Sequence, residues 1–369
     1  DTDNVVESFP CQVAWSMPKS RNANIDAWTS FGALSLMDMD GGAGPVTKLA
    51  LFAGNVYCFQ PSAISIIPYN SRTQVTAEDG MPVELAASKI VGPKYTLTDK
   101  RGAASNLAVT LTDSAIYFAD ELNRTLCALT QNIASLTDSL GFHSWARSLP
   151  SFAFRVFAEP GTGSVLFDRV GGDGDALSYN ERCQRFESFI DVGGSVVTLN
   201  ARGDTLAIHK NDLDNQGEYR MWRLGTGERN RFYGLNRPYW VDCLISGEGV
   251  TDKVFDVVEF SGDVTVDGTL SPMRCPYNLI RAYNEYQDSG WVRLDFKRFS
   301  ASASKNLFRL WRAFVPRDAS KRRPGKVAER MRNPWCHIAL KYDPSLEEDP
   351  YRRNDMAELQ EINVDYNEE

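Results

Sequence analysis

The residue types that most often do chemistry in proteins are few and scattered in this sequence. Its three histidines, His143, His209 and His337, lie among apolar and aromatic neighbours, and none belongs to an HxH, HExxH or Cys/His pattern. Imidazole-based metal sites need two or more ligands at such spacings. No GxSxG segment and no glycine-rich loop ending in GKS or GKT is present. The sequence therefore predicts no catalytic residue, no metal site and no bound cofactor.

Two acidic loops bear on calcium binding. One fits the first half of a calcium loop, in which oxygen ligands alternate along a tight turn, but its twelfth position is Arg223 where a bidentate glutamate is required. Its residues are Asp212, Asp214, Gln216 and Gly217. The other acidic turn has no recognisable ligand pattern and consists of Asp168, Asp173 and Asp175. We interpret both loops as solvated hairpin tips.

The cysteines favour reduced, buried thiols over a disulfide framework. There are seven, an odd number, and no CxxC spacing occurs. The closest pair, Cys243 and Cys275, is about thirty residues apart, much sparser than in disulfide-stapled secreted domains. We expect the chain to be made in a reducing cytoplasm.

Length and composition exclude several classes of protein. The chain has 369 residues, of which 43% are hydrophobic and 11% aromatic, so it can bury a full core and is too apolar to be disordered. The apolar runs are far shorter than the roughly 20 residues of a membrane-spanning helix, so no membrane insertion is expected. Residue 1 is Asp and no leader follows it, which leads us to expect that the chain begins inside a longer precursor.

The formal net charge of -8 is unevenly distributed. Residues 297–332 hold twelve basic and two acidic side chains, whereas residues 343–369 hold ten acidic and two basic ones. Such blocks can be a solvated face with an acidic tail, a polar assembly interface or a surface near a polyanion. We prefer the interface and take as its candidate basic cluster Arg317, Lys321, Arg322, Arg323, Lys326, Arg330 and Arg332. The acidic tail of one subunit would lie on the basic stretch of its neighbour.

The elements that position these side chains are predicted to be strands. Short β-rich runs come in pairs around turns rich in Gly, Asp, Asn or Ser, which is typical of hairpins. The pairs are 56–59 with 63–67, 115–118 with 125–129, 164–167 with 176–179, and 204–209 with 219–224. Aromatic residues follow two of the hairpins, at 142–145 and 185–189. This succession is typical of β-propeller blades, although a sandwich or several small sheets would give similar local signals.

We predict an all-β fold: propeller-like blades, then further antiparallel β-structure and an acidic C-terminal tail. The predicted segments are an N-terminal arm (1–30), the blades (31–235), an antiparallel region with the basic segment (236–343) and an extended or mobile tail (344–369). Longer strands are expected at 239–246, 253–260, 291–299, 307–315 and 335–342. Short helices are predicted only at 128–140 and 320–331.

The eight tryptophans occur singly, which favours burial in blade cores over a stacking platform for sugars or bases. The Ser-x-Asp-x-Gly-x-Thr-Trp turns of sialidases, which are propeller enzymes, are absent. The residues therefore favour a protein that is not an enzyme.

Several segments, taken in order, resemble one family. They are the Phe-Pro and Trp-Ser of 8–18, the Asp-x-Trp-x-x-Phe of 26–31, the Gly-Pro start at 44–46, and the stretches 59–64, 177–181, 186–189, 309–317 and 330–335. This pattern resembles the tail muzzle, or stabilisation, proteins of crAss-like bacteriophages, whose members are longer and carry these motifs toward their C-terminal part.

The resemblance implies a structural virion protein and carries over no catalytic residues. It implies a ring at the distal end of a short tail that closes or narrows the DNA exit channel until infection. The implied partners are copies of the chain in a ring, with six-fold symmetry as the expectation, and other tail proteins. Packaged DNA would lie near the channel without sequence-specific binding. Assembly in the bacterial host cytoplasm is expected. The alternatives are a propeller that binds a host-surface glycan or protein and, third, a propeller-fold glycoside hydrolase.

Overall fold

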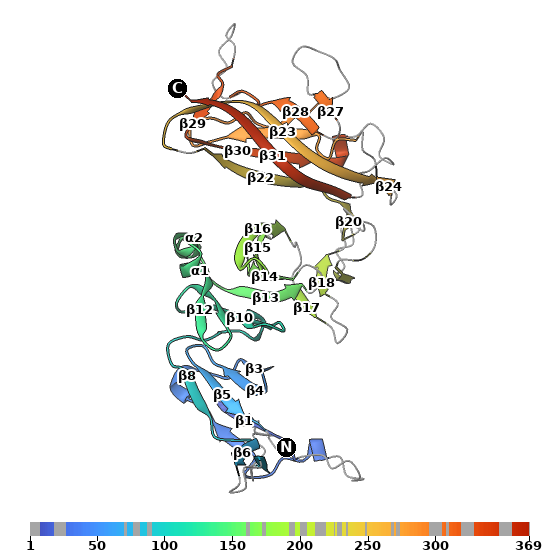
Figure 1. Cartoon of the computed structure of the whole chain (residues 1–369). Helices are drawn as coiled ribbons and strands as arrows, with labels where there is room; N and C mark the ends of the chain where they lie inside the picture. The colour runs from blue at the N-terminus through green and yellow to red at the C-terminus, as the bar shows by residue number, and fades with distance from the viewer. Residues whose placement is uncertain are drawn as a thin grey trace, which may run out of the picture. The chain divides into compact units, whose positions relative to one another are not determined.

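The computed structural model describes residues 8–17, 27–69, 72–76, 82–86, 91–159, 163–171, 175–191, 196–199, 205–210, 219–224, 226, 231–233, 235–247, 249–266, 269–270, 274–294, 305–307, 310–318, 328–346 and 356–368. The chain divides into two compact units (Figure 1). Unit 1 comprises Asp1–His209 and Met221–Leu224, and unit 2 comprises Lys210–Arg220 and Gly225–Glu369. The units divide between residues 209 and 225, before residue 235, where the predicted blades end. The finer segment boundaries stay predictions.

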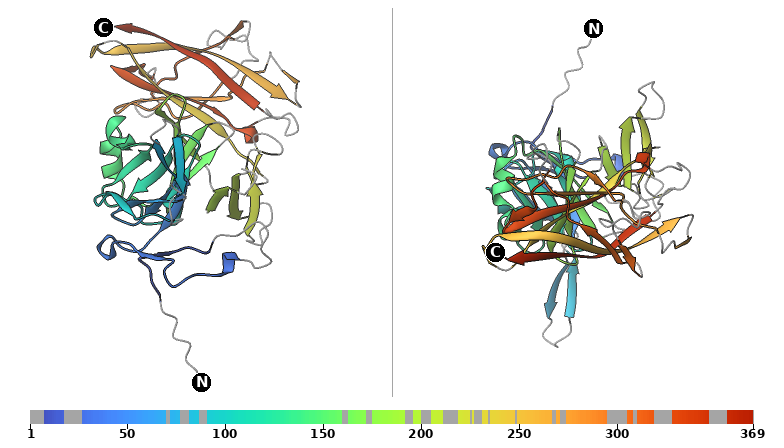
Figure 2. Two further views of the ribbon diagram at one scale, coloured as in Figure 1. Left: turned by 60° about the horizontal axis from the view of Figure 1, so that its bottom comes forward. Right: turned by 90° about the horizontal axis from the view of Figure 1, so that it is seen from above.

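Unit 1 begins with small antiparallel sheets. Strands β1 (Gln12–Ala14) and β2 (Leu36–Asp38) pair with each other, and the short 3-10 helices η1 (Ala27–Thr29) and η2 (Gly41–Ala43) flank β2. A four-stranded sheet follows, in the order β3 (Lys48–Phe52), β4 (Asn55–Phe59), β5 (Ile64–Pro68) and β8 (Tyr95–Thr98). The hairpin of β6 (Arg72–Thr76) and β7 (Pro82–Ala86) is inserted between β5 and β8 and stands out from the unit (Figure 2, right).

Three further meanders complete unit 1. The second four-stranded sheet consists of β9 (Val109–Leu111), β10 (Ile116–Asp120), β11 (Thr125–Leu129) and β12 (Ile133–Ser135), with η3 (Asn106–Ala108) before it. The third consists of β13 (Phe154–Glu159), β14 (Ser164–Arg169), β15 (Asp175–Asn180) and β16 (Arg185–Asp191). The last, three-stranded sheet consists of β17 (Val196–Leu199), β18 (Thr205–Lys210) and β19 (Tyr219–Arg223). The four predicted hairpins are thus β4–β5, β10–β11, β14–β15 and β18–β19.

The sheets of unit 1 succeed one another in the manner of blades. Each four- or three-stranded sheet is a meander in chain order, apart from the inserted β6–β7 hairpin. Consecutive sheets meet through their first strands, because β9 lies against both β3 and β13, and β13 also lies against β17. In a β-propeller, four-stranded sheets of this kind are repeated around a central channel. A closed ring of blades stays a prediction, whereas the all-β class is confirmed.

Two short helices, α1 (Leu136–Ser139) and α2 (His143–Ser148), connect the second and third four-stranded sheets. The predicted helix at 128–140 is wrong except for its last turn. Residues 127–129 and 133–135 pair as β11 and β12, so their backbone groups are satisfied across the sheet. Helix α1 starts only at Leu136, after its N-cap Ser135, whose hydroxyl accepts a hydrogen bond from the Asp138 N–H.

The core of unit 1 runs through its successive sheets. Its largest fully buried side chains include Phe59, Phe118 and Phe167, one from each four-stranded sheet. The aromatic residues that follow two predicted hairpins gather in one cluster, with Phe142 and Phe186 rings 4.6 Å apart and Trp145 and Phe189 rings 5.8 Å apart. These residues therefore join α2 to the third sheet.

Unit 2 is built mainly of two antiparallel sheets packed face to face (Figure 1). The first has the order β22 (Tyr239–Ser246), β30 (Trp335–Tyr342), β25 (Leu279–Tyr283) and β26 (Val292–Arg293). The second is built on the long strand β23 (Lys253–Val266), which pairs on one side with β24 (Thr269–Leu270), β28 (Leu310–Phe314) and β29 (Met331–Asn333), and on the other with β31 (Met356–Glu368). Strand β27 (Lys305–Leu307) extends this sheet beyond β28. The small pair β20 (Arg231–Phe232) and β21 (Leu235–Asn236) precedes β22, and η4 (Pro344–Leu346) follows β30.

The predicted strands of this region are reproduced to different degrees. Strands β22 and β30 have the predicted bounds, and β23 is longer than predicted. The predicted strand at 291–299 contains only β26 among its described residues, and 295–299 lies outside them. Of the predicted helix at 320–331, only residues 328–331 are described, and Met331 begins β29.

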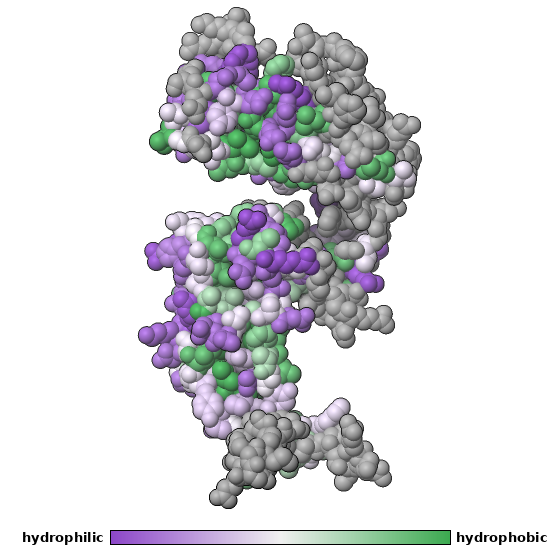
Figure 3. Space-filling view, in the orientation of Figure 1, coloured by the Kyte–Doolittle hydropathy of each residue, from purple (hydrophilic) through white to green (hydrophobic). Residues whose placement is uncertain are grey.

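The acidic C-terminal segment is extended but, over residues 356–368, it is not a free tail. It forms strand β31, which pairs with β23 from Lys253 to Thr265. Its inward side chains Leu359, Ile362, Val364 and Tyr366 pack on the core between the two sheets. The prediction of an extended or mobile tail missed this alternation of apolar and polar residues, which has the period of a half-buried strand. Hydrophilic residues run across the face of unit 2 that carries β23 and β31 (Figure 3).

No helix among the described residues is long and apolar enough to cross a membrane.

Candidate functional site

The predicted basic cluster lies at one end of the β23 sheet, as far as it is described. Arg317 follows β28, Arg330 precedes β29 and Arg332 lies within β29. The other four residues, Lys321, Arg322, Arg323 and Lys326, lie outside the described residues. Arg317 donates from Nη1 to the carbonyl oxygen of Ala328 at 3.1 Å, and the Asp318 N–H donates to the Glu329 carbonyl. These hydrogen bonds therefore connect the segment that follows β28 to the segment that precedes β29.

Part of the basic charge is compensated within the same sheet. Arg330 Nη1 lies 2.9 Å from Asp256 Oδ1, and the Asn367 side chain of β31 donates to the other oxygen of Asp256 at 2.9 Å. Arg312 of β28 lies 3.2 Å from Glu259 and 3.5 Å from Asp365. Arg312 of the basic stretch and Asp365 of the acidic segment thus meet within this chain, across β23. The contact predicted between neighbouring subunits is a separate one and stays a prediction. The role of the basic cluster in a subunit interface stays a prediction.

The candidate calcium loops give no ligand cluster among the described residues. Asp168 is buried and lies 2.5 Å from the Arg155 guanidinium, so its charge has a protein partner. Asp175 begins β15, while Asp173 and the loop from Asp212 to Gly217 lie outside the described residues. Over the described part of the chain, no group of three or more His, Cys, Asp or Glu is placed to hold a metal ion.

All seven cysteines are free thiols, and three of them, Cys58, Cys127 and Cys336, are fully buried. Burial raises the pKa of the Cys58 and Cys127 thiols to about 11 and that of Cys336 to about 12, because a thiolate is poorly solvated in the core. Cys183 is exposed. The environments of the three buried thiols are those of structural residues, not of activated nucleophiles.

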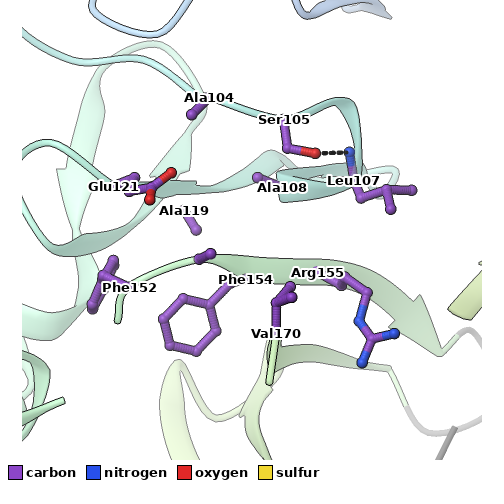
Figure 4. Close-up of a pocket in the computed structure, with 11 residues that line it drawn as sticks. Ala104, Ser105, Leu107, Ala108, Ala119, Glu121, Phe152, Phe154, Arg155 and Val170 are labelled. Carbon is purple, nitrogen blue, oxygen red and sulfur yellow. Dashed lines mark hydrogen bonds between the residues drawn. The ribbon is translucent and has the colours of Figure 1, made fainter. Parts of the chain in front are cut away.

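A pocket of about 390 Å³ lies in unit 1 between the second and third four-stranded sheets (Figure 4). Small and apolar side chains such as Ala108, Ala119 and Phe154 form most of its lining. Its two charged residues, Glu121 and Arg155, lie at different ends, and Arg155 pairs with buried Asp168. Ser105 accepts from the Leu107 N–H as the cap of η3. Its polar groups do not converge on a common point, so we interpret this pocket as a gap between neighbouring sheets.

A second hollow, of about 300 Å³, lies on the outer face of the β22–β30–β25–β26 sheet in unit 2, and we call it the sheet groove. Its lining consists of Trp240, Asp242, Arg281, Tyr283, Trp291, Ala339 and Lys341. The strand register explains the hollow. Asp242, Ala339 and Arg281 form one cross-strand row, so a single methyl group stands between two long polar side chains. The next row places Trp240 beside Lys341.

The polar side chains of the sheet groove are held by hydrogen bonds. Asp242 accepts from the Tyr283 hydroxyl and lies 3.0 Å from His337 Nδ1. Arg281 pairs with both carboxylate oxygens of Asp288, at 2.9 and 2.5 Å. Hydrogen bonding to Arg281 lowers the pKa of Asp288, whereas burial and the Asp242 bond raise the pKa of Tyr283 to about 12.

Aromatic rings complete the sheet groove and its surroundings. The Tyr283 and His337 rings stack at 4.6 Å with an interplanar angle of 6°, and the Arg281 guanidinium lies 4.8 Å from the Tyr283 ring centre. The Trp240 side chain is 55% exposed and that of Trp291 is 41% exposed. The prediction that the tryptophans fill blade cores is therefore wrong for these two and for exposed Trp28, although Trp311 is buried.

The sequence pattern of β22 does not show which of its two faces is turned to solvent. Alternation in β22 places Trp240, Asp242 and Leu244 on one side and Tyr239, Val241 and Cys243 on the other. Both sides carry apolar residues, so the pattern alone does not identify the one that faces the core.

The described sheets define an all-β protein built from successive antiparallel meanders, with a two-sheet unit at its C-terminal side. A family model described as Crassvirus muzzle protein matches residues 1–211. A curated protein of Bacteroides phage crAss001, named "Muzzle protein", is 28% identical over 344 residues, which cover 91% of this chain and 24% of that protein. The chain belongs to the family of Crassvirus muzzle proteins, and the resemblance seen in its motifs is confirmed.

Membership of this family makes the chain a viral protein, a structural component of the bacteriophage virion. The chain spans about a quarter of the length of the curated relative that it matches.

Proposed function

We propose that this chain forms part of a ring at the distal end of a short phage tail, where it narrows or closes the DNA exit channel and retains the packaged genome until infection. Membership of the muzzle family carries this proposal. The chain acts by shape and not by catalysis: rigid sheets closed by short turns supply a block that can be repeated around an axis. Copies in a closed ring need two complementary, different faces.

The N-terminal part of unit 1 is our candidate for one such face. Six large apolar side chains among its described residues are between 45% and 94% exposed: Phe9, Met17, Trp28, Phe31, Leu34 and Leu36. Exposed apolar residues gathered in one region are typical of surfaces that are covered in an assembly. Trp28 and Phe31 belong to the Asp-x-Trp-x-x-Phe pattern by which the chain resembles its family, which supports a role for this surface in the assembled virion.

The charges of the β23 sheet argue against a DNA-binding surface. Arg312 and Arg330 are paired with carboxylates of their own sheet, which lowers the net charge available to phosphates. A tail channel must let DNA slide, and strong phosphate binding would oppose this. Copies of the chain and other tail proteins are therefore the partners that we propose, with DNA nearby but not bound in a sequence-specific way.

Electron microscopy of the virion that carries this chain tests the proposal. We expect its density in a ring coaxial with the tail at the distal end. Density in a peripheral appendage would contradict the proposal and favour a host-surface binding protein.

A variant phage tests the function of the N-terminal surface. Replacing Trp28 and Phe31 by serine is expected to release packaged DNA early, measured as the fraction of genomes that nuclease digests in purified particles. Leu122→Ser, at a 64% exposed residue in the β10–β11 turn, is the matched control and should leave this fraction unchanged. Equal genome retention by the double variant and the control would contradict the role of this surface.

The alternative of a surface-binding protein is favoured by one observation, the sheet groove with its exposed tryptophans. No observation favours the third alternative, a glycoside hydrolase, which needs two carboxylates flanking one groove. Among the described residues that line the two pockets, each pocket has one carboxylate, Glu121 or Asp242.

A further inference from the structure

The sheet groove differs from the rest of the described surface in combining exposed indoles with fixed polar groups. Trp240 lies in β22, and Trp291 lies just before β26. Lys341 lies between the two indoles. It is the cross-strand neighbour of Trp240, and its ammonium is 5.6 Å from the Trp291 ring centre. An exposed indole leaves a large apolar surface in water. Two of them on the rim of one hollow offer flat apolar walls to a ligand.

The polar groups of the groove are ordered before any ligand arrives. Asp242 is held from two sides by Tyr283 and His337, and the Tyr283 ring is itself stacked on His337. Arg281 is fixed by its two bonds to Asp288. A site whose side chains are already held loses little conformational entropy on binding.

The charge balance of the groove selects the class of ligand. Asp242 carries one negative charge, while Arg281 is compensated by Asp288 and Lys341 by Asp343, whose oxygen lies 3.4 Å from its ammonium. A strand of nucleic acid or another polyanion would therefore gain little here and would meet the Asp242 carboxylate. A neutral ligand with hydroxyl groups at its edges and C–H groups on its faces matches both the carboxylate and the indoles.

We propose that the sheet groove binds a neutral saccharide of one or two pyranose units. Its sugar rings stack on Trp240 and Trp291, and their hydroxyl groups donate to Asp242 and accept from Lys341. A volume of about 300 Å³ is at the lower end for small-molecule pockets, which suits a ligand of this size. This site goes beyond the ring function and does not depend on it.

Binding of neutral oligosaccharides to the 369-residue chain tests the proposal. A panel of gluco-, manno- and galacto-configured di- and trisaccharides is titrated, with calorimetry and protein-observed NMR as readouts. We expect at least one of them to bind and to shift the indole N–H signals of Trp240 and Trp291. Trp240→Ala and Trp291→Ala should each weaken binding about tenfold or more, because each removes a stacking wall. Leu122→Ala, at an exposed apolar residue in the β10–β11 turn of unit 1, is the control and should bind like the unaltered chain.

Two further measurements separate this ligand class from others. Asp242→Asn keeps the size of the side chain, so weaker binding by that folded variant supports a carboxylate contact with hydroxyl groups. Raising the salt concentration should change the affinity less than about twofold, because no ionic contact with the ligand is involved. Binding by no neutral saccharide, binding unaffected by both tryptophan substitutions, or binding of anionic sugars only would overturn the proposal. A change in oligomeric mass caused by Trp240→Ala, without a change in sugar binding, would identify the groove as a protein interface and would also overturn it.

Discussion

Gln60 and Gly102 illustrate how single residues join the first two blade-like sheets of unit 1. The Gln60 side chain is 1% exposed and donates from Nε2 to the carbonyl oxygens of Asp40 and Gly44, at 2.7 and 2.5 Å. The backbone carbonyl oxygen of Gln60 accepts from the Ala103 N–H at 2.9 Å. These bonds explain why a Phe-Gln-Pro segment belongs to the family-like pattern: it fastens the loops before β3 and β9 to the first sheet.

Gly102 is needed at this junction because the backbones approach too closely for a side chain. A Cβ atom there would lie 2.0 Å from the Gln60 carbonyl oxygen, which is backbone and cannot turn aside. We expect Gly102→Ala to lower the free energy of unfolding of unit 1 by about 2–4 kcal/mol, measured by chemical denaturation. Gly41→Ala, with no atom within 4 Å of its Cβ, is the control and should change it by less than about 1 kcal/mol. Equal stabilities of the two variants would contradict the close approach.

Burial is expected to decide which thiols react. At about pH 8, a disulfide reagent should modify exposed Cys183 first, whereas Cys58, Cys127 and Cys336 should react only on unfolding. The raised pKa values of these three thiols keep them protonated up to about pH 10, so raising the pH toward 9 should not speed their modification. Mass spectrometry of timed digests measures each site. Rapid modification of Cys127 in the folded chain would show that its environment is wrongly assigned.

Strand β31 is the element whose role changed most between sequence and structure. Four of its residues, Leu359, Ile362, Val364 and Tyr366, pack on the unit 2 core, and Tyr366 lies over the buried ammonium of Lys253 at 5.6 Å from its ring centre. Gly247 leaves room for this arrangement, since a Cβ there would meet both Tyr366 and Lys253 within 2.5 Å. Apolar burial therefore holds the acidic strand in place, with the charges on its outward face.

The contributions of packing and charge in β31 are separable by two adjacent substitutions. Tyr366→Ala is expected to destabilise unit 2 by about 2–4 kcal/mol, because it removes the ring packed on Phe255 and Lys253. Asp365→Asn should change stability by less than about 1 kcal/mol, because the Arg312–Asp365 pair is largely exposed. Thermal or denaturant unfolding measures both. A larger loss for Asp365→Asn than for Tyr366→Ala would mean that charge and not packing attaches the strand.

At the scale of the whole molecule, the two units have separate cores. Phe118 belongs to the core of unit 1, and Ile338 belongs to that of unit 2. Each lies in a strand paired only within its own unit, as far as the described residues extend. The chain is thus organised as two bodies with different architectures, a row of meanders and a two-sheet sandwich.

This organisation predicts that core substitutions act on one unit at a time. Phe118→Ala should lower the unfolding temperature of unit 1 and Ile338→Ala that of unit 2, each at a cost of about 2–5 kcal/mol. Scanning calorimetry combined with hydrogen exchange assigns each transition to a unit. A single transition that both substitutions lower equally would mean that the two units unfold as one.

Much of the strand content followed from local pattern, and most of the site did not. Strands β22 and β30 were predicted with their observed bounds because β-rich runs of this length end at turn residues. The helix predicted at 128–140 failed because the backbone of 133–135 pairs with β11, a contact that helix propensity does not contain. Of the predicted basic cluster, only Arg317, Arg330 and Arg332 are described, and Arg330 has its carboxylate partner in this chain.

By itself, the sequence determined the all-β class, the hairpins, the uneven charge and the family, since turn chemistry, alternation and motif order are local properties of the chain. Only the tertiary structure decided that the acidic segment is a core-packed strand and that Trp240, Asp242, Ala339 and Arg281 share one groove. Those results depend on register between strands about 40 to 100 residues apart. Register is set by which face of each strand the core buries, and that becomes definite only when the sheets pack together.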